Sequence, residues 1–124
     1  MPKSFLERKL EGSDASLKSN NRKRSDKRES FLAKDLGGKT TVNSGATFGE
    51  NDVETESLSI DDKTTVKSSY TITVDTFKKV KARTKADKMP VLTINFENDN
   101  LCLAVINYSD LKFMIELIKG LNEQ

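Results

Sequence analysis

Apolar residues recur along the chain at two spacings, one typical of helices and the other of strands. Between residues 26 and 36 the spacing is helical, because Leu32, Ala33 and Leu36 follow Glu29 by three, four and seven positions. Elsewhere, short apolar stretches alternate with polar residues, as in half-buried strands. The expected elements are helices at 26–36, 74–88 and 110–121 and strands at 39–45, 52–55, 58–64, 91–97 and 101–108. This order predicts an α/β fold, a single small domain with a central mixed five-stranded sheet flanked by helices.

Residues that flank the predicted helices support their boundaries. The two glycines at 37–38 end the first helix. Thr73 and Ser109 stand where an N-cap is needed for the second and third helices. Pro90 marks the exit from the second helix.

The last predicted helix is apolar on almost every side, and a helix of that kind must be buried on almost every side. A domain this small has little surface with which to cover it, so we expect a contact with a second copy of the chain. Cys102 lies in a predicted strand, and we expect it to be a buried small apolar residue. The apolar residues of this helix are Leu111, Phe113, Met114, Ile115, Leu117, Ile118 and Leu121.

The N-terminal segment differs in composition from the rest of the chain. Residues 1–25 are small, polar and charged, which predicts a flexible arm without a core of its own. Residues 1–28 hold nine basic and four acidic residues, a charge of +5, whereas residues 29–124 hold twelve and fifteen, a charge of −3. A basic arm on a mildly acidic body indicates an anionic polymer as partner, with a solvated tail as the alternative. The predicted α/β domain then occupies residues 26–124.

The composition excludes several kinds of chemistry. The 124 residues include one cysteine and no histidine, so an internal disulfide, a structural zinc site and histidine acid–base catalysis are excluded. Catalysis must then use carboxylates, lysines, hydroxyls or a hard metal ion held by oxygen. No apolar run reaches the roughly 18 residues of a membrane span. The first residues lack the apolar segment of a secretory signal, so we expect a reducing cytoplasm and no membrane contact.

The predicted strand at 58–64 carries charge where a buried strand should not. Its second half contains Asp61, Asp62 and Lys63. Charged side chains among apolar neighbours are costly unless they are paired, bound to a metal or in contact with water. These three residues are therefore candidates for a functional site.

A hairpin between the strands at 52–55 and 58–64 sorts their residues onto two faces of the sheet. With a two-residue turn, Val53 pairs with Ile60, and the apolar residues gather on one face. Asp52 then stands opposite Asp61 on the other face, with their Cβ atoms about 4.5–5.5 Å apart.

Two carboxylates at that separation repel each other, and a divalent cation between them removes the conflict. Mg²⁺ prefers oxygen ligands and usually keeps several of its waters. Asp52 and Asp61 with Lys63 beside them therefore predict a metal site that also holds a cationic side chain. The alternative is an exposed sheet face with a simple ion pair between Lys63 and Asp61 or Asp62.

Four features in order along the chain resemble the PD-(D/E)xK nuclease superfamily. They are Glu29 on the first helix, Ser44–Gly45 in a turn after the first strand, Asp52 at the start of the second strand, and the acidic-x-Lys motif at 61–63. The chain is most similar to small Holliday-junction resolvases and resolvase-like phage nucleases, over about residues 26–118. The resemblance implies a restriction-endonuclease-like sheet. The sequence departs from the common pattern by having aspartate at the acidic position of the motif.

The resemblance also implies a role for each matched residue. Asp52 and Asp61 would be metal ligands together with the main-chain carbonyl of Asp62, and Lys63 would be the motif lysine. Glu29 would help to hold a metal or a metal-bound water. The side chain of Asp62 should point toward the packed face of the sheet, so either that face is wet or Asp62 is itself a ligand after a shift in register.

Further residues are expected at the DNA. The basic arm would contact the phosphate backbone, the turn after the first strand would lie near it, and one lysine falls where phage relatives often carry a second lysine. The expected DNA-binding residues are Arg22, Lys23, Arg24, Lys39, Ser44 and Lys67.

The function that this resemblance implies is an Mg²⁺-dependent endodeoxyribonuclease, with Mn²⁺ able to replace Mg²⁺, that cuts branched DNA such as Holliday junctions. Such an enzyme would be a homodimer in the cytoplasm of a bacterium or a phage-infected host. The alternatives are a non-catalytic DNA-binding module on a degenerate nuclease fold, and a small interaction protein with a solvated charged sheet.

Overall fold

The computed structural model of the chain describes residues 26–41 and 50–123. The predicted basic arm at 1–25, with Arg22, Lys23 and Arg24, lies outside these residues, and so does Ser44. The described elements, in chain order, are a helix at 26–36, β1 (Lys39–Thr40), β2 (Val53–Glu54), β3 (Leu58–Thr65), α3 (Val74–Ala82), β4 (Met89–Phe96), a 3-10 turn (Glu97–Asp99), β5 (Leu101–Val105) and α4 (Tyr108–Asn122).

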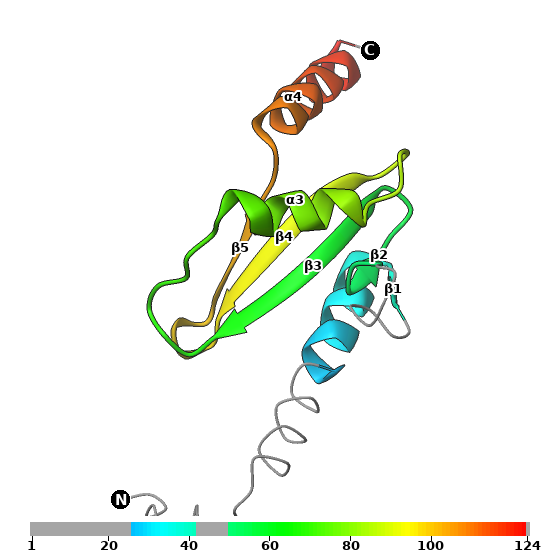
Figure 1. Cartoon of the computed structure of the whole chain (residues 1–124). Coiled ribbons are helices and arrows are strands. Elements are labelled where there is room, and N and C mark those ends of the chain that lie inside the picture. Colours follow the sequence, from blue (N-terminus) through cyan, green and yellow to red (C-terminus); the bar gives the residue numbers. More distant parts are fainter. Residues whose placement is uncertain (1–25, 42–49, 124) are drawn as a thin grey trace, which may run out of the picture.

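The five strands form one mixed sheet in the order β1-β2-β3-β4-β5, which confirms the predicted fold class (Figure 1). β3 and β4 are parallel, and every other neighbouring pair is antiparallel. Parallel neighbours need a crossover connection, and α3 provides it between β3 and β4. The two long central strands therefore carry the middle of the sheet, and the shorter strands lie outside them.

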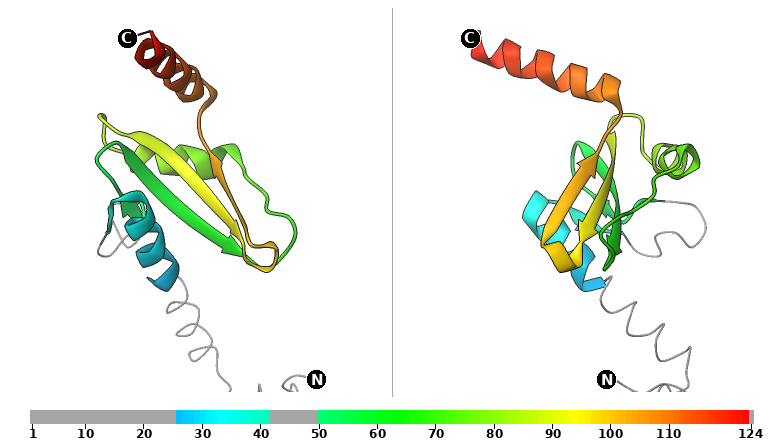
Figure 2. Two further views of the ribbon diagram at one scale, coloured as in Figure 1. Left: turned by 180° about the vertical axis from the view of Figure 1, so that it is seen from behind. Right: turned by 90° about the vertical axis from the view of Figure 1, so that its left-hand side faces the viewer.

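Each face of the sheet is covered by one helix (Figure 2). The helix at 26–36 buries Leu32 and Ala33 against Val53, Ile60 and Val91. These contacts follow the helical spacing that the sequence predicts for this segment.

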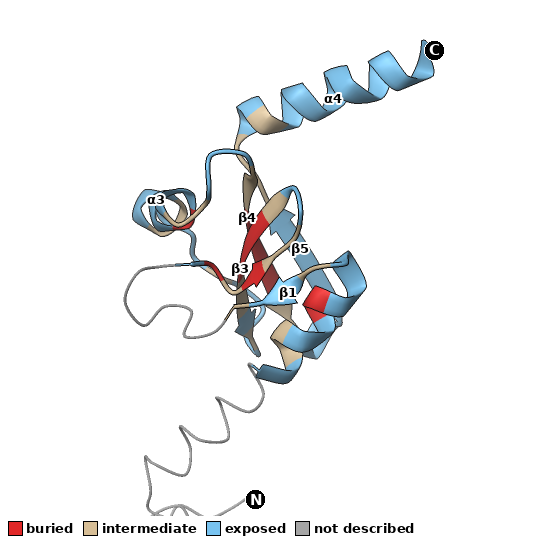
Figure 3. Cartoon of the chain, turned by 90° about the vertical axis from the view of Figure 1, so that its right-hand side faces the viewer, coloured by how far each residue is buried: buried red, intermediate tan, exposed pale blue. Residues whose placement is uncertain are grey.

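α3 covers the opposite face, where Val80 packs against Leu92 and Ile94. Because side chains alternate along a strand, β4 contributes Val91 to one face and Leu92 to the other. The buried residues lie in the middle of the sheet (Figure 3).

α3 is shorter than the predicted helix at 74–88, although its start is as predicted. The side chain of Thr73 accepts a hydrogen bond from the main-chain nitrogen of Thr76 at 3.1 Å and caps the helix. Near the other end, the main-chain oxygen of Val80 accepts hydrogen bonds from the Thr84 hydroxyl and the Asn51 amide. These side-chain donors take the place of a continuing helical main chain, so the helix ends at Ala82.

The C-terminal part of the chain corrects two expectations. The N-cap of α4 is Asn107, whose side-chain oxygen accepts from the main-chain nitrogen of Ser109 at 3.0 Å, so Ser109 is not the cap. Cys102 is exposed because β5 is an edge strand, although Arg28 of the helix at 26–36 donates a hydrogen bond of 3.0 Å to its sulfur. As expected for a domain this small, the described part of the chain does not cover α4, because the helix extends away from the sheet and its residues 111–122 are exposed (Figures 1 and 3).

The junction between the helix at 26–36 and β1 predicts a strong effect of one methyl group. A Cβ atom added at Gly38 would collide with the main-chain oxygen of Glu54 and the side chain of Thr55. Gly38→Ala should therefore lower the free energy of unfolding by about 2 kcal/mol or more, as other overpacked sites do. Urea unfolding followed by circular dichroism measures this loss.

Gly120→Ala is the matched control. Gly120 lies in the exposed helix α4 and has no atom within 4 Å of an added Cβ. The same substitution there should stabilise the protein slightly, by up to about 1 kcal/mol. Equal stability of the Gly38 variant and the wild type would contradict the close approach of β2 to this junction.

Candidate functional site

The predicted register of the hairpin is the observed one. Val53 pairs with Ile60 and Glu54 pairs with Ser59. The turn lacks the glycine or asparagine that two-residue turns favour. Instead, the Thr55 hydroxyl accepts hydrogen bonds from the main-chain nitrogens of Ser57 at 3.2 Å and Leu58 at 2.9 Å. The local hydroxyl thus replaces the turn residue that the sequence does not provide.

Continuing this register brings Asp52 opposite Asp61. Oδ2 of Asp52 accepts a hydrogen bond of 2.9 Å from the main-chain nitrogen of Asp62, which fixes the Asp52 carboxylate against β3. The two aspartates that the sequence places together are therefore neighbours in the structure.

Asp61 and Lys63 lie on the same face of β3 and form an ion pair. Nζ of Lys63 is 3.1 Å from Oδ2 of Asp61, and Asp61 is only 7% exposed. Partial burial lowers the pKa of Lys63, but the negative charge and hydrogen bond of Asp61, helped by Tyr70 and Asp52, raise it above its usual value. Lys63 is therefore a fixed cation beside the two carboxylates, and the ion pair named as the alternative is present.

Asp62 points to the opposite face, toward the helix at 26–36, and its charge is compensated there. Oδ2 lies 3.2 Å from Nε of Arg28, and Oδ1 accepts a 2.6 Å hydrogen bond from the hydroxyl of Thr93. The face is the packed one, as predicted, and the register has not shifted. The carboxylate is held by Arg28 and Thr93, which leaves the main-chain carbonyl of Asp62 as the ligand that the resemblance implies.

Glu29 is half-buried on the helix at 26–36, in the field of the neighbouring acidic residues. Burial, followed by the negative charges of Asp52, Asp26, Asp62 and Asp61, raises the pKa of the Glu29 carboxyl to about 7. The helix therefore adds a third acidic side chain within electrostatic reach of Asp52 and Asp61.

The side-chain oxygens of this region are the kind of ligand that a hard divalent cation prefers. Asp52, Asp61 and Glu29 offer carboxylate oxygens, and the pKa of Glu29 is raised by burial and then by the neighbouring negative charges, which a cation would offset. Within residues 26–41 and 50–123, no three acidic or thiol side chains stand together as a ready-made metal cage. A cation held by one or two carboxylates and waters, as Mg²⁺ usually is, does not need such a cage.

A second polar cluster, which the sequence analysis missed, supports Asp52 from behind. The neighbouring residue Asn51 is 1% exposed, and its amide donates to the Ser59 hydroxyl at 2.8 Å and to the main-chain oxygen of Val80 at 3.1 Å. The side-chain oxygen of Asn51 meets no hydrogen-bond donor among the described residues. The hydrogen bonds of Asn51 thus connect the chain just before Asp52 to both β3 and α3.

Glu54 completes this cluster. Its carboxylate accepts from the Ser59 hydroxyl at 2.7 Å and pairs with Nζ of Lys88 at 3.0 Å. Glu54 is therefore engaged away from Asp52 and Asp61, although all lie on neighbouring strands. The sequence signal was weak because Lys88 is 34 positions away from its partner.

The expected DNA-binding residues within the described chain do not gather at one point. Lys39 is exposed on β1, and Lys67 is exposed in the segment that follows β3. Of the other predicted residues, Lys63 contacts Asp61, Asp52 contacts the main chain of Asp62, and Glu29 lies within electrostatic reach of these aspartates.

Comparison with known proteins finds no matching family model, no matching curated protein and no matching solved structure. Among the described residues, no helix has the length and apolar character needed to cross a membrane.

The raised pKa of Glu29 predicts a pH-dependent stability. Its pKa is about 7 in the folded protein against 4.5 for the free group, so the folded state keeps a proton that the unfolded state has lost. Stability should therefore fall as the pH rises from about 4.5 to 7 and stay low above that range. In Glu29→Gln this contribution is absent, so the melting temperature of the variant should gain on the wild type across that range, measured in the presence of a chelator.

Glu116→Gln, at an exposed position of α4, is the control, and its difference from the wild type should not change over the same range. Parallel curves for Glu29→Gln and wild type would show that burial and the neighbouring aspartates do not raise the pKa of Glu29 in the folded protein.

Proposed function

We propose that the protein is an Mg²⁺-dependent endodeoxyribonuclease that hydrolyses phosphodiester bonds in branched DNA, such as Holliday junctions, in the cytoplasm of a bacterium or a phage-infected cell. One observation carries this proposal. The Asp52 carboxylate lies against β3, where it accepts a 2.9 Å hydrogen bond from the main-chain nitrogen of Asp62, and the Lys63 ammonium is 3.1 Å from the carboxylate of the adjacent Asp61. Closely spaced carboxylates with a lysine beside them are the groups that metal-assisted phosphoryl chemistry uses. An inert sheet surface would have no need of them.

Each residue of the site has a chemical task in this proposal. Asp52, Asp61 and the carbonyl of Asp62 would hold the Mg²⁺ or Mn²⁺ ion, which when bound supplies Lewis acidity to the phosphate. Glu29 would orient the attacking water by accepting its hydrogen bond. Lys63 would stabilise the negative charge that grows on the phosphate in the transition state.

A non-catalytic DNA-binding module is the second candidate. The Lys63–Asp61 ion pair favours it, because a lysine already neutralises one of the two carboxylates. The two candidates differ in one observable, since only the nuclease cuts DNA when Mg²⁺ is present.

The experiment uses a labelled four-way junction and a linear duplex of matched sequence, each with Mg²⁺ and with chelator. The nuclease should cut the junction faster than the duplex and only with the metal. Asp52→Asn and Asp61→Asn should each reduce single-turnover cleavage by several orders of magnitude, because each removes a charged ligand, while affinity in chelator persists.

Asp87→Asn, at an exposed position outside the site, is the matched control and should cut as the wild type does. Binding without cutting by the wild type would favour the second candidate. Full activity in either ligand variant would remove that aspartate from the site.

We also propose that the protein is a homodimer joined through α4. At 100° per residue its apolar side chains span an arc about 200° wide, twice the stripe that one packing surface covers. Lys112, Glu116, Lys119 and Glu123 form the narrow polar side. A helix with so wide an apolar arc needs two packing surfaces, and the described part of its own chain supplies neither (Figures 1 and 3).

A second copy of the chain offers both surfaces. Leu101 and Leu103 of β5 are 48% and 45% exposed. They lie on the same face of the sheet as α3, but α3 does not cover this edge. If α4 of each copy lies on β5 of the other, a two-fold axis brings the two α4 helices together as well. Each chain thus offers an uncovered helix and an uncovered strand that complement each other.

The exposed area is sufficient for a stable dimer. Ten large side chains from β5 and α4 are each 38–74% exposed. Taking roughly 150–200 Å² for a fully exposed side chain of this size, they present on the order of 900 Å². A standard protein interface buries about 800 Å² on each partner.

The dimer predicts the effect of charge on its surface. Leu117→Glu with Ile118→Glu should convert a dimer into a monomer, because four carboxylates would enter an apolar interface, and Leu103→Glu should weaken the dimer as well. Sedimentation equilibrium at micromolar concentrations measures the mass. Lys112→Ala, on the polar side of α4, should remain dimeric, and a monomeric wild type at tens of micromolar would contradict the proposal.

A further inference from the structure

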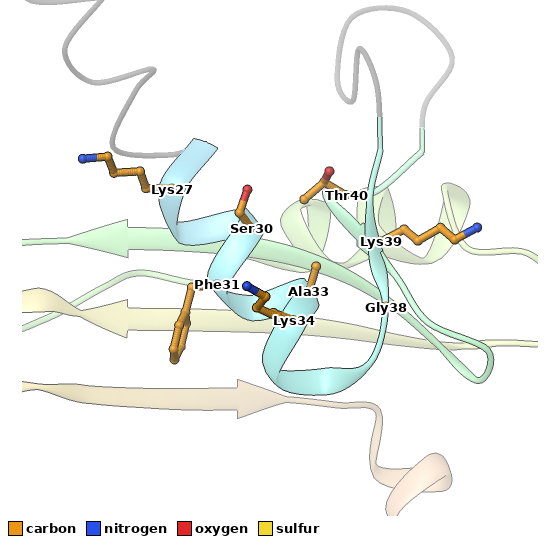
Figure 4. Close-up of a pocket in the computed structure, with 8 residues that line it drawn as sticks. All are labelled: Lys27, Ser30, Phe31, Ala33, Lys34, Gly38, Lys39 and Thr40. Atoms are coloured by element: carbon orange, nitrogen blue, oxygen red, sulfur yellow. The ribbon is translucent and has the colours of Figure 1, made fainter.

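A hollow of about 680 Å³ opens between the helix at 26–36 and β1 (Figure 4). None of the residues proposed for catalysis lines it. Its lining combines three lysines, two hydroxyl side chains and a phenylalanine, and none of the described residues that line it is acidic. The residues that matter for its chemistry are Lys27, Ser30, Phe31, Lys34, Lys39 and Thr40.

The lysines are spread along the hollow and do not converge on one point. In Figure 4, Lys27 and Lys39 point to opposite sides, and the Lys34 ammonium lies between them. All three side chains are exposed. A single small anion would need converging donors, whereas successive phosphates of a polymer match a row of separated cations.

Two segments that line the hollow are connected to residues of the candidate site. Ser30 follows Glu29 directly on the helix at 26–36. Next to Thr40, the main-chain nitrogen of Thr41 donates to the main-chain oxygen of Asp52 at 3.1 Å. A nucleic-acid strand that runs from Asp52 over the edge of the sheet at β1 would therefore reach the row of lysines on the face that the helix at 26–36 covers.

Phe31 gives the hollow a feature that a duplex backbone does not need. Its side chain is 59% exposed, and its ring lies 5.8 Å from the guanidinium carbon of Arg28, which also pairs with Asp62. Arg28 thus holds the ring in place and links it to β3. An exposed aromatic ring beside a basic track suits the stacking of an unpaired base.

We propose that this hollow binds a single-stranded stretch of DNA next to the bond to be cut, with Lys27, Lys34 and Lys39 on its phosphates and Phe31 against one of its bases. The proposal rests on the proposed function only in taking DNA as the ligand. It deepens that function, because it specifies a branched substrate with unpaired nucleotides at the branch.

The test measures equilibrium binding of the full chain to a labelled oligothymidylate and to a blunt duplex of the same length, by fluorescence anisotropy with chelator and over a range of salt concentrations. Removing three phosphate contacts with Lys27→Ala, Lys34→Ala and Lys39→Ala together should lower the salt slope for the single strand by about two and the affinity by tenfold or more. Lys78→Ala, Lys79→Ala and Lys81→Ala together are the matched control. They remove the same charge from exposed positions of α3, and the slope should stay within half a unit of wild type.

Phe31→Leu separates stacking from charge. It should weaken single-strand binding about tenfold, on the scale of one lost base–aromatic stack, and change duplex binding less than twofold. Phe31→Tyr should restore single-strand binding, and thermal unfolding should show that all variants are folded. Equal effects of the two lysine sets, equal loss of single-strand and duplex binding in Phe31→Leu, or single-strand binding too weak to measure in wild type would each overturn the proposal.

These outcomes are independent of cleavage. A wild type that cuts a junction while its hollow variants bind single strands normally would overturn this inference and leave the proposed function intact. If the wild type cuts nothing and the hollow variants lose single-strand binding, the proposed function is overturned and the hollow remains a DNA site.

Discussion

The pairing of β2 with β3 is the constraint on which the rest of the structure depends. Val53 and Ile60 pair directly, and both are completely buried. Because side chains alternate along a strand, a slip of one residue would turn this apolar pair to the wrong face and separate Asp52 from Asp61. The packing of the core and the geometry of the candidate site are therefore fixed by the same register.

The fold handles the charges of β3 in a different way on each face. On the packed face, Asp62 is neutralised by Arg28 and accepts a hydrogen bond from Thr93. On the other face, Asp61 is close to Lys63 and to the half-buried Asp52. The first arrangement satisfies one aspartate completely, whereas the second concentrates charge at a partly open place, which is where substrate and metal chemistry can occur.

Sequence patterns predicted the sheet, the hairpin register and the facing of Asp62, because all three follow from the alternation of apolar residues over a few positions. They did not predict that Arg28 reaches Asp62, or that Asn51 supports the strand that carries Asp52. These contacts join residues 34 and 29 positions apart, and no local period records them. The apolar pattern of α4 indicated that a domain this small could not cover the helix, but such a pattern does not record which surface of which chain provides the partner.

The central claim is that the β2–β3 register creates a site for a divalent cation. Binding of Mn²⁺ to the full chain, followed by electron paramagnetic resonance without DNA, tests this claim directly. The account predicts that the wild type and Asp87→Asn bind at least one Mn²⁺ ion per chain, and that Asp52→Asn combined with Asp61→Asn loses that ion while remaining folded. Equal Mn²⁺ binding by the double variant and the wild type would contradict the account.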